Sequence, residues 1–197
     1  MGNPNWIELM RRALTRHVTK ETNDKIMRGA EKFDTLDETG KANWMRQAVK
    51  RIDQAVADDQ VKIDLFTTCS CNCYTGHIDE FKKIWKETGD IDKLLEAMHG
   101  TVFMVKPMRE GNKILITKAP RFPEQFAKAT TPEEKRYYFC HCDHVRATEK
   151  PLPKTYCLCS AGWCKAIFEE SLEREVGVEV VKTVLSNDEV CQFAVHL

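Results

Sequence analysis

The sequence lacks any long hydrophobic run, since no apolar stretch approaches the roughly 18 residues that a membrane-spanning helix needs. Its first residues, MGNPNWIELMRRALTRH, contain neither the apolar core nor the cleavage motif of a signal peptide. Trp6 stands where a myristoylation signal requires Ser or Thr. We therefore expect a cytoplasmic protein with no membrane partner.

The chain also has no excess of positive or negative charge. Lys and Arg number 30, and Asp and Glu also number 30, so the formal net charge is zero. A nucleic-acid-binding surface needs a basic excess to neutralise phosphates. The composition therefore predicts no nucleic-acid partner, and its 42% of hydrophobic residues indicates an ordinary globular chain with a sizeable core.

The motifs of standard hydrolases and nucleotide-binding proteins are also lacking. There is no HExxH, no GxSxG and no P-loop, and no CxxC lies on a thioredoxin-like pattern. The sequence thus leaves open whether the protein is an enzyme.

Helical spacing of apolar residues dominates the first part of the chain. It predicts helices at about 7–18, 22–33 and 41–57, which would form an N-terminal helical layer over residues 1–60. Residues 61–68, VKIDLFTT, mix β-branched and aromatic side chains and therefore indicate a short strand. Two more helices are expected within residues 78–98.

The remaining patterns predict an antiparallel sheet. A β-hairpin is expected within 101–120, with its turn at Glu110-Gly111-Asn112. Ser160 is the expected N-cap of a helix that reaches about residue 173, and strand, turn and strand follow. The chain is thus predicted to be an α+β protein, with N-terminal helices packed with an antiparallel sheet and a helix–strand–turn–strand ending. Residues 61–197 would form its cysteine-rich α+β domain, unless the whole chain is one compact domain.

Cysteine stands out among the residues that are present. The chain has nine cysteines, an odd number, and cytoplasmic thiols are kept reduced, so we expect no disulfide framework. Residues i and i+2 of an extended segment point to one side, so a Cys-x-Cys unit can offer its thiols in one direction. Zinc takes four Cys or His ligands, and the units therefore predict a zinc site. The expected ligands are Cys69, Cys71, Cys73, Cys140, Cys142, Cys157 and Cys159.

Three other roles for these thiols stay open. They could line a pocket as small, soft side chains. A thiol near His141, His144 or Arg146 could be redox-active. A cysteine paired with one of these histidines could also act as a nucleophile on a carbonyl or amidine carbon.

Three residues near the cysteines are the candidate ligand-binding side chains. Arg146 offers a bidentate fork to a carboxylate, and His144 lies two residues before it. Trp163 follows Gly162 directly after a Cys-x-Cys unit, where it could form the wall of a pocket. A solvated surface for the first two and a core position for Trp163 are the alternatives.

The last forty residues resemble the C-terminal part of 4-vinyl-reductase-like domains. The shared pattern is Gly162-Trp163 opening a helix, Phe168 on that helix, Glu179 on a β-rich strand, and then Cys191-x-Phe193. The resemblance implies an α+β small-molecule-binding module, some members of which hold a structural zinc. Where those members have a second cysteine this chain has Thr183, so Cys191 is not expected to hold zinc in the family manner.

A second resemblance rests on the segments CHCDHVR and YCLCSAGW. They are similar to proteins loosely related to the L-2-amino-thiazoline-4-carboxylate hydrolase-like family. This resemblance implies a hydrolase acting on a small C–N or C–S substrate, with either a cysteine nucleophile or metal-activated water.

The leading hypothesis is a small-molecule-binding protein with a cysteine-lined, zinc-binding site. A hydrolase of a small substrate is the alternative, and a structural zinc protein that docks a partner is the third hypothesis. A small-molecule ligand and a second copy in a homodimer are the expected partners.

Overall fold

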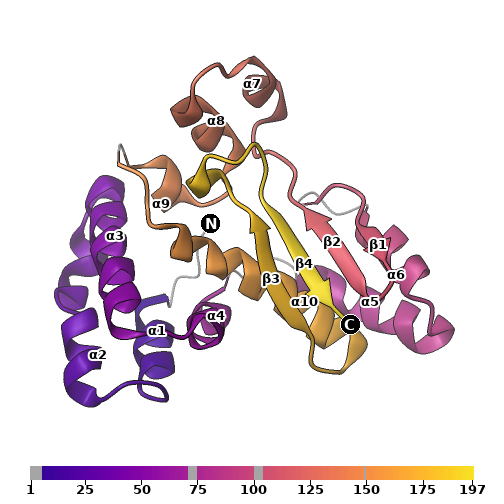
Figure 1. The fold of residues 1–197 in the computed structure, drawn as a ribbon, viewed down its shortest axis with the longest axis horizontal. Coiled ribbons are helices and arrows are strands. Elements are labelled where there is room, and N and C mark those ends of the chain that lie inside the picture. The colour runs from indigo at the N-terminus through magenta and orange to yellow at the C-terminus, as the bar shows by residue number, and fades with distance from the viewer. Residues whose placement is uncertain (1–5, 71–74, 100–103, 149) are drawn as a thin grey trace.

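The computed structural model describes residues 6–70, 75–99, 104–148 and 150–197. Helices form the first part of this structure, which lies at one side in Figure 1. They are α1 (Trp6–Leu14), α2 (Lys20–Ile26), the 3₁₀ helix η1 (Ala30–Thr35), α3 (Glu38–Ala55) and α4 (Asp59–Thr68). No helix among the described residues is both long enough and apolar enough to span a bilayer.

Polar caps define where these helices begin. The Asp37 carboxylate accepts a hydrogen bond of 2.7 Å from the Gly40 N–H at the start of α3. Thr19 caps α2 in the same way, through the N–H of Thr22. Such caps satisfy N–H groups that a helix leaves without an internal partner. The apolar faces of the helices then pack into one cluster, the helical core, which includes Met10, Leu14, Met45, Ile52 and Phe66.

The strand predicted at 61–68 is wrong, because these residues form most of α4. The Asp58 carboxylate caps this helix by accepting hydrogen bonds from the N–H groups of Gln60 (2.8 Å) and Val61 (3.4 Å). Leu65 and Phe66 are buried, and α4 packs along α10 (Leu158–Leu172). The cap and this packing outweigh the β-propensity of the segment.

The sheet confirms the predicted α+β class. Its order is β1-β2-β4-β3, with every neighbouring pair antiparallel. The predicted hairpin forms between the first two strands, where Gly111 takes a φ of +63° that favours glycine. The strands are β1 (Met108–Glu110), β2 (Lys113–Thr117), β3 (Gly177–Lys182) and β4 (Gln192–His196).

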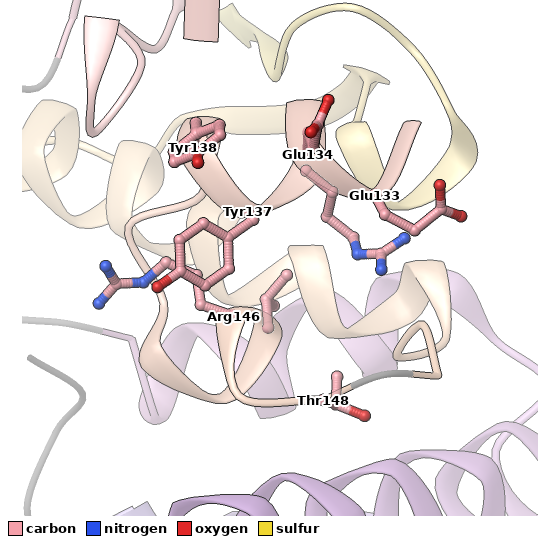
Figure 2. Close-up of a pocket in the computed structure, with 8 residues that line it drawn as sticks. Glu133, Glu134, Tyr137, Tyr138, Arg146 and Thr148 are labelled. Carbon is pink, nitrogen blue, oxygen red and sulfur yellow. The ribbon is translucent and has the colours of Figure 1, made fainter. Parts of the chain in front are cut away.

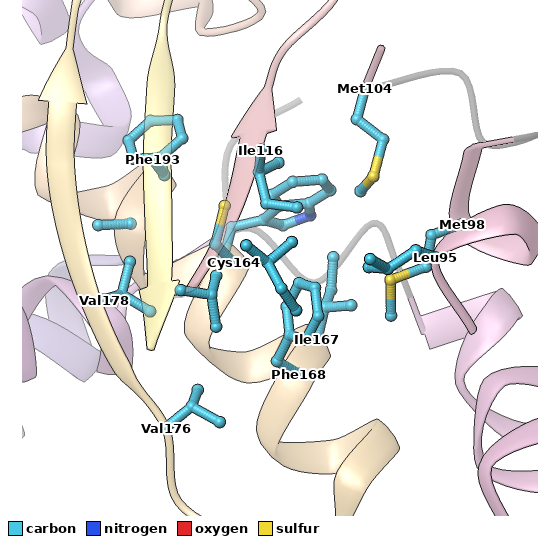
Figure 3. Packing of buried hydrophobic residues seen from close by; sticks show 14 of the residues in the cluster. Leu95, Met98, Met104, Ile116, Cys164, Ile167, Phe168, Val176, Val178 and Phe193 are labelled. Atoms are coloured by element: carbon cyan, nitrogen blue, oxygen red, sulfur yellow. The ribbon is translucent and has the colours of Figure 1, made fainter. Parts of the chain in front are cut away.

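One face of the sheet packs on α10 and forms a second cluster, the sheet core. Figure 3 shows Ile116, Val178 and Phe193 from the strands facing Cys164 and Phe168 of α10. Leu95 and Met98 close this core from the side of α6 (Ile91–His99). The remaining elements are α5 (Thr75–Thr88), α7 (Pro123–Lys128), α8 (Pro132–Phe139), α9 (Asp143–Arg146), η2 (Lys154–Cys157) and η3 (Val184–Ser186).

Helix α10 begins at Leu158, so its N-cap is Cys157 and not the predicted Ser160. Gly162 lies on the face of α10 that crosses α4. A Cβ atom at Gly162 would lie 2.4 Å from the Cα of Thr67, closer than real contacts allow. Glycine therefore lets the two helices touch through their backbones, and this crossing brings Cys69, just after α4, beside the start of α10.

Candidate functional site

Six cysteines from separate parts of the chain gather at the seam between the helical core and the sheet core. Cys140 lies within electrostatic range of Cys142 and Cys191, and Cys157 lies within that range of Cys140 and Cys191. Cys69 likewise lies within electrostatic range of Cys159. We name this group the thiol cluster; its members are Cys69, Cys140, Cys142, Cys157, Cys159 and Cys191.

Tyr156 is the centre of one half of the thiol cluster. Its hydroxyl lies 3.2 Å from the Cys142 sulfur. Cys159 is close enough to act electrostatically on the same hydroxyl, and its sulfur lies 4.0 Å from the carbonyl oxygen of Cys69. Burial raises the pKa of Tyr156, so its hydroxyl stays protonated and can donate to a sulfur.

Thr183 organises the other half. Its hydroxyl lies 2.6 Å from the Cys157 sulfur and accepts a longer contact of 4.0 Å from the Cys191 sulfur. Lys118 is the nearby cation, with its Nζ 5.1 Å from the ring centroid of Trp163. One hydroxyl thus holds two thiols whose sequence positions are far apart.

Burial keeps these thiols neutral. It raises the pKa of Cys140 to about 12, with the neighbouring Cys142 as the second cause. Burial likewise raises the pKa of Cys69, Cys157 and Cys191. A thiol with a raised pKa is a poor nucleophile and metal ligand until it loses its proton. Cys69, Cys140, Cys157 and Cys191 are therefore protonated and poorly reactive at neutral pH.

The predicted zinc ligands meet only in part. Cys69, Cys140, Cys142, Cys157 and Cys159 all belong to the thiol cluster, whereas Cys71 and Cys73 lie outside the described residues. Among the residues that are described, no three Cys, His, Asp or Glu side chains are arranged to hold a metal ion. The donors present do not fit zinc as they stand, and the zinc site stays a prediction.

A pocket of about 390 Å³ lies beside the thiol cluster, between α8 and α9. Figure 2 shows Tyr137 and Arg146 on one side of it and Glu133 and Glu134 on the other. We name it the anion pocket after the two arginines in its lining, Arg136 and Arg146. Its lining residues are Glu133, Glu134, Arg136, Tyr137, Tyr138, Val145, Arg146 and Thr148.

Arg136 is the most unusual residue of the anion pocket. It lies on α8 and is only 6% exposed. No described residue forms an ion pair or a hydrogen bond with its guanidinium group. The nearby Glu134 carboxylate is already engaged, because it accepts hydrogen bonds from the N–H groups of Thr130 and Thr131 in the capping box of α8.

Arg146 reaches the pocket from α9. Its guanidinium group bonds to Asp143 and lies 5.4 Å from the ring centroid of Phe122. Its Nε is buried and has no hydrogen-bond partner among the described residues. Of the three predicted ligand-binding residues, Arg146 is the one that lines this pocket.

The other two predicted ligand-binding residues lie elsewhere. His144 points toward the helical layer, where its ring meets that of Phe33 edge-on at 6.0 Å, and burial lowers its pKa. Trp163 is buried in the sheet core. The sequence patterns did not predict Arg136 as a site residue. It lies three residues before the apolar Phe139, so both side chains lie on one face of α8, and this spacing is the signal that indicates its burial.

A second pocket, of about 440 Å³, lies between α4, η2 and β3. Its best-buried cation is Lys62, whose Nζ already lies 2.9 Å from Asp59 and 3.9 Å from Asp53. Because this cation is neutralised within the protein, the second pocket makes a weaker case for a charged ligand than the anion pocket does.

Comparison with known proteins gives one family match and no activity. Residues 131–197 match the model of a family of unknown function, DUF6144. That stretch includes the whole lining of the anion pocket and five members of the thiol cluster. No curated protein and no solved structure matches the chain. The two resemblances noted from the sequence stay predictions.

Proposed function

We propose that this chain is a small-molecule-binding protein whose ligand carries an oxyanion, a carboxylate or a phosphate, that binds Arg136 in the anion pocket. The observation that carries the proposal is the burial of Arg136 without a counter-ion among the described residues. A guanidinium group that has lost most of its contact with solvent gains free energy by pairing with an oxyanion. A ligand oxyanion would supply the missing partner.

The guanidinium group suits this role better than an ammonium group would. It is charged at every accessible pH, and its planar fork matches the two oxygens of a carboxylate or phosphate. The pocket volume of about 390 Å³ lies within the range typical of small-molecule sites, roughly 300–1,000 Å³. Arg136 is therefore placed to orient a ligand of modest size.

The remaining lining indicates the rest of the ligand. Tyr137 is 47% exposed and offers an aromatic face to an apolar or flat ligand body. Glu133 is exposed and makes no ion pair among the described residues, so the pocket also accommodates a ligand with an amino group. The pocket thus has a cationic floor and an acidic rim.

The hydrolase alternative gains less support. A cysteine nucleophile needs a thiolate, whereas burial raises the pKa of five described cysteines, with Cys164 at about 12. Activation by a metal has no ready ligand group among the described residues. Binding is therefore the function that the geometry favours.

Isothermal titration calorimetry with a panel of small carboxylates, amino acids and inorganic phosphate tests the proposal. We expect saturable binding of at least one oxyanion, and loss of that binding in Arg136→Met. The substitution also removes an unpaired buried charge, so its free energy of unfolding should equal or exceed that of the unsubstituted protein.

Arg174→Met is the matched control. Arg174 is exposed and lies outside the anion pocket, so this variant changes the net charge equally and should bind as the unsubstituted protein does. Equal binding by Arg136→Met and the unsubstituted protein would contradict the proposal. A large loss of stability in Arg136→Met would do so too, because the arginine would then serve the fold.

A further inference from the structure

The two arginines of the anion pocket are joined by a single Cys-x-Cys unit. The N–H of Cys140 donates to the carbonyl of Arg136 at 3.1 Å, which makes Cys140 the C-cap of α8. The N–H of Arg146 donates to the carbonyl of Cys142 at 3.3 Å, and Cys142 is the N-cap of α9. The backbone of residues 140–142 therefore sets where both arginines lie.

The same unit is anchored on its other side by the thiol cluster. The Cys142 sulfur contacts the Tyr156 hydroxyl at 3.2 Å, and both cysteines pack on the helical core. His141, between them, lies 2.8 Å through its Nε2 from the carbonyl oxygen of Ala119. Each of residues 140–142 thus makes an anchoring contact, and one of these contacts is made by the Cys142 thiol.

We infer that Cys142 is a modification site that regulates the anion pocket: a mixed disulfide at Cys142 weakens oxyanion binding at Arg136 and Arg146. This inference rests on the proposed function, because it assumes that the pocket binds an oxyanion. It assigns to the conspicuous cysteines a role that needs neither a metal nor a catalytic thiolate.

Cys142 is the member of the thiol cluster best placed to react. Its side chain is half-buried, whereas Cys69 and Cys191 are buried. Cys140, Cys157 and Cys159 are also half-buried, but burial raises the pKa of Cys140 and Cys157, and the Cys159 sulfur lies against the carbonyl oxygen of Cys69. The Tyr156 hydroxyl can donate a hydrogen bond to the Cys142 thiolate as it forms. These contacts favour exchange at Cys142 with a small disulfide that enters from solvent.

The chemistry is thiol–disulfide exchange with a low-molecular-weight disulfide, RSSR. The Cys142 thiol loses its proton, and the thiolate attacks one sulfur of RSSR. A Cys142–S–S–R bond forms, the RS–SR bond breaks, and the released RS⁻ takes up the proton. Cysteine sulfur is oxidised, half of the small disulfide is reduced to a thiol, and a reducing thiol reverses the step.

The added group cannot fit without a shift. Cys142 packs against Tyr156 and the helical core, so a substituent on its sulfur must break the sulfur–hydroxyl contact and displace residues 140–142. Helix α9 has only four residues, and it is therefore the element that moves most easily. Movement of α9 carries Val145 and Arg146 out of the pocket wall.

The test uses the full chain and bis(2-hydroxyethyl) disulfide, with the modified cysteine located by peptide mass spectrometry. Calorimetry with the tightest oxyanion of the panel then compares the reduced and the modified protein. We expect about a tenfold weaker affinity after modification, within the range usual for coupled sites, and recovery after reduction. Far-ultraviolet circular dichroism should stay unchanged.

Cys142→Ser is the matched control, because serine keeps the contact with Tyr156 and cannot form the disulfide. Disulfide treatment of this variant should leave its affinity unchanged. Linkage requires the reverse effect as well, so bound oxyanion should lower the equilibrium constant for mixed-disulfide formation at Cys142 by the same factor.

The outcomes separate the two proposals. If the reduced protein binds no oxyanion, the proposed function fails and the regulation fails with it. If it binds an oxyanion equally well before and after modification of Cys142, only the regulation is overturned. Absence of any mixed disulfide at Cys142 in excess reagent overturns it too.

Discussion

Burial drives several thiols and histidines of the site toward their neutral forms. It raises the pKa of Cys140 to about 12 and lowers the pKa of His141 to about 4. The arginines are the exception, because a guanidinium group does not lose its proton in the working range of proteins. At residue scale, therefore, the buried thiols and His141 are neutral, and the arginines and the glutamates of the pocket carry its charge.

The raised thiol pKa values predict a loss of stability in alkali. Cys164 stays protonated in the native state up to a pKa of about 12, but it ionises near pH 8.5 when unfolded. Its contribution is thus fully present below pH 8.5 and declines as the pH rises toward 12. Between pH 8 and pH 10 the free energy of unfolding should fall by roughly 2 kcal/mol through this one group.

Urea denaturation of reduced protein at pH 8 and pH 10 measures this fall. Cys164→Ala is the comparison, because it lacks the titrating thiol while the other groups remain. The fall should be smaller in Cys164→Ala by about the stated amount. An identical pH dependence in the two proteins would show that Cys164 is not buried in its neutral form.

The helix crossing of α4 and α10 is the contact on which the thiol cluster depends at element scale. We expect Gly162→Ala to lower the free energy of unfolding by about 1–3 kcal/mol, because the new Cβ must push the Thr67 backbone away. It should also separate Cys69 from Cys159. Chemical denaturation measures the first effect, and the rate of thiol alkylation measures the second.

Gly76→Ala is the control for that substitution. Gly76 lies in α5 with no atom within 4 Å of a built Cβ, and alanine favours helix over glycine. This variant should be as stable as the unsubstituted protein or more so. If Gly162→Ala behaved like Gly76→Ala, the close crossing would be contradicted.

The sequence predicts elements well where the determining signal is local. The hairpin at Gly111 follows from turn chemistry, and the helix at 41–57, which corresponds to α3, follows from apolar spacing; both are confirmed. The prediction of a strand at 61–68 is wrong, because these residues form a helix, α4, that packs against α10. Arg136 could not be predicted as a site residue, since its lack of a partner is a property of the folded chain. The Cys-x-Cys units predict that thiols gather, but not that Thr183 and Tyr156 hold them.

The helical core draws residues from both halves of the chain. The helical core takes Trp6 and Met10 from the first helix but also Val145, Leu152 and Tyr156 from the C-terminal half. The thiol cluster lies where this core meets the sheet core, and α10 contacts α4 on one side and the sheet on the other. The helical layer therefore cannot bury its apolar face without the later part of the chain.

Because the helical core needs residues from both halves of the chain, we expect the whole chain to unfold cooperatively. Tryptophan fluorescence reports on the helical core through Trp6 and Trp44, and on the sheet core through Trp85 and Trp163. Variants that keep only one of these reporters should give the same urea midpoint, because neither core is complete alone. Midpoints that differ between the reporters would indicate two independent units.

The strand order has a consequence for synthesis of the chain. Strand β4 lies between β2 and β3, and its Gln192 pairs with Thr117, 75 residues earlier. Until the ribosome has released residues 192–196, β2 keeps an open edge on which another chain could add. The cysteines of the 140–159 segment emerge during that interval, before the sheet that buries Cys157 against Thr183 exists. Nascent chains are thus most exposed to oxidation and to strand-edge association between the synthesis of β2 and that of β4, a period in which a chaperone would protect them.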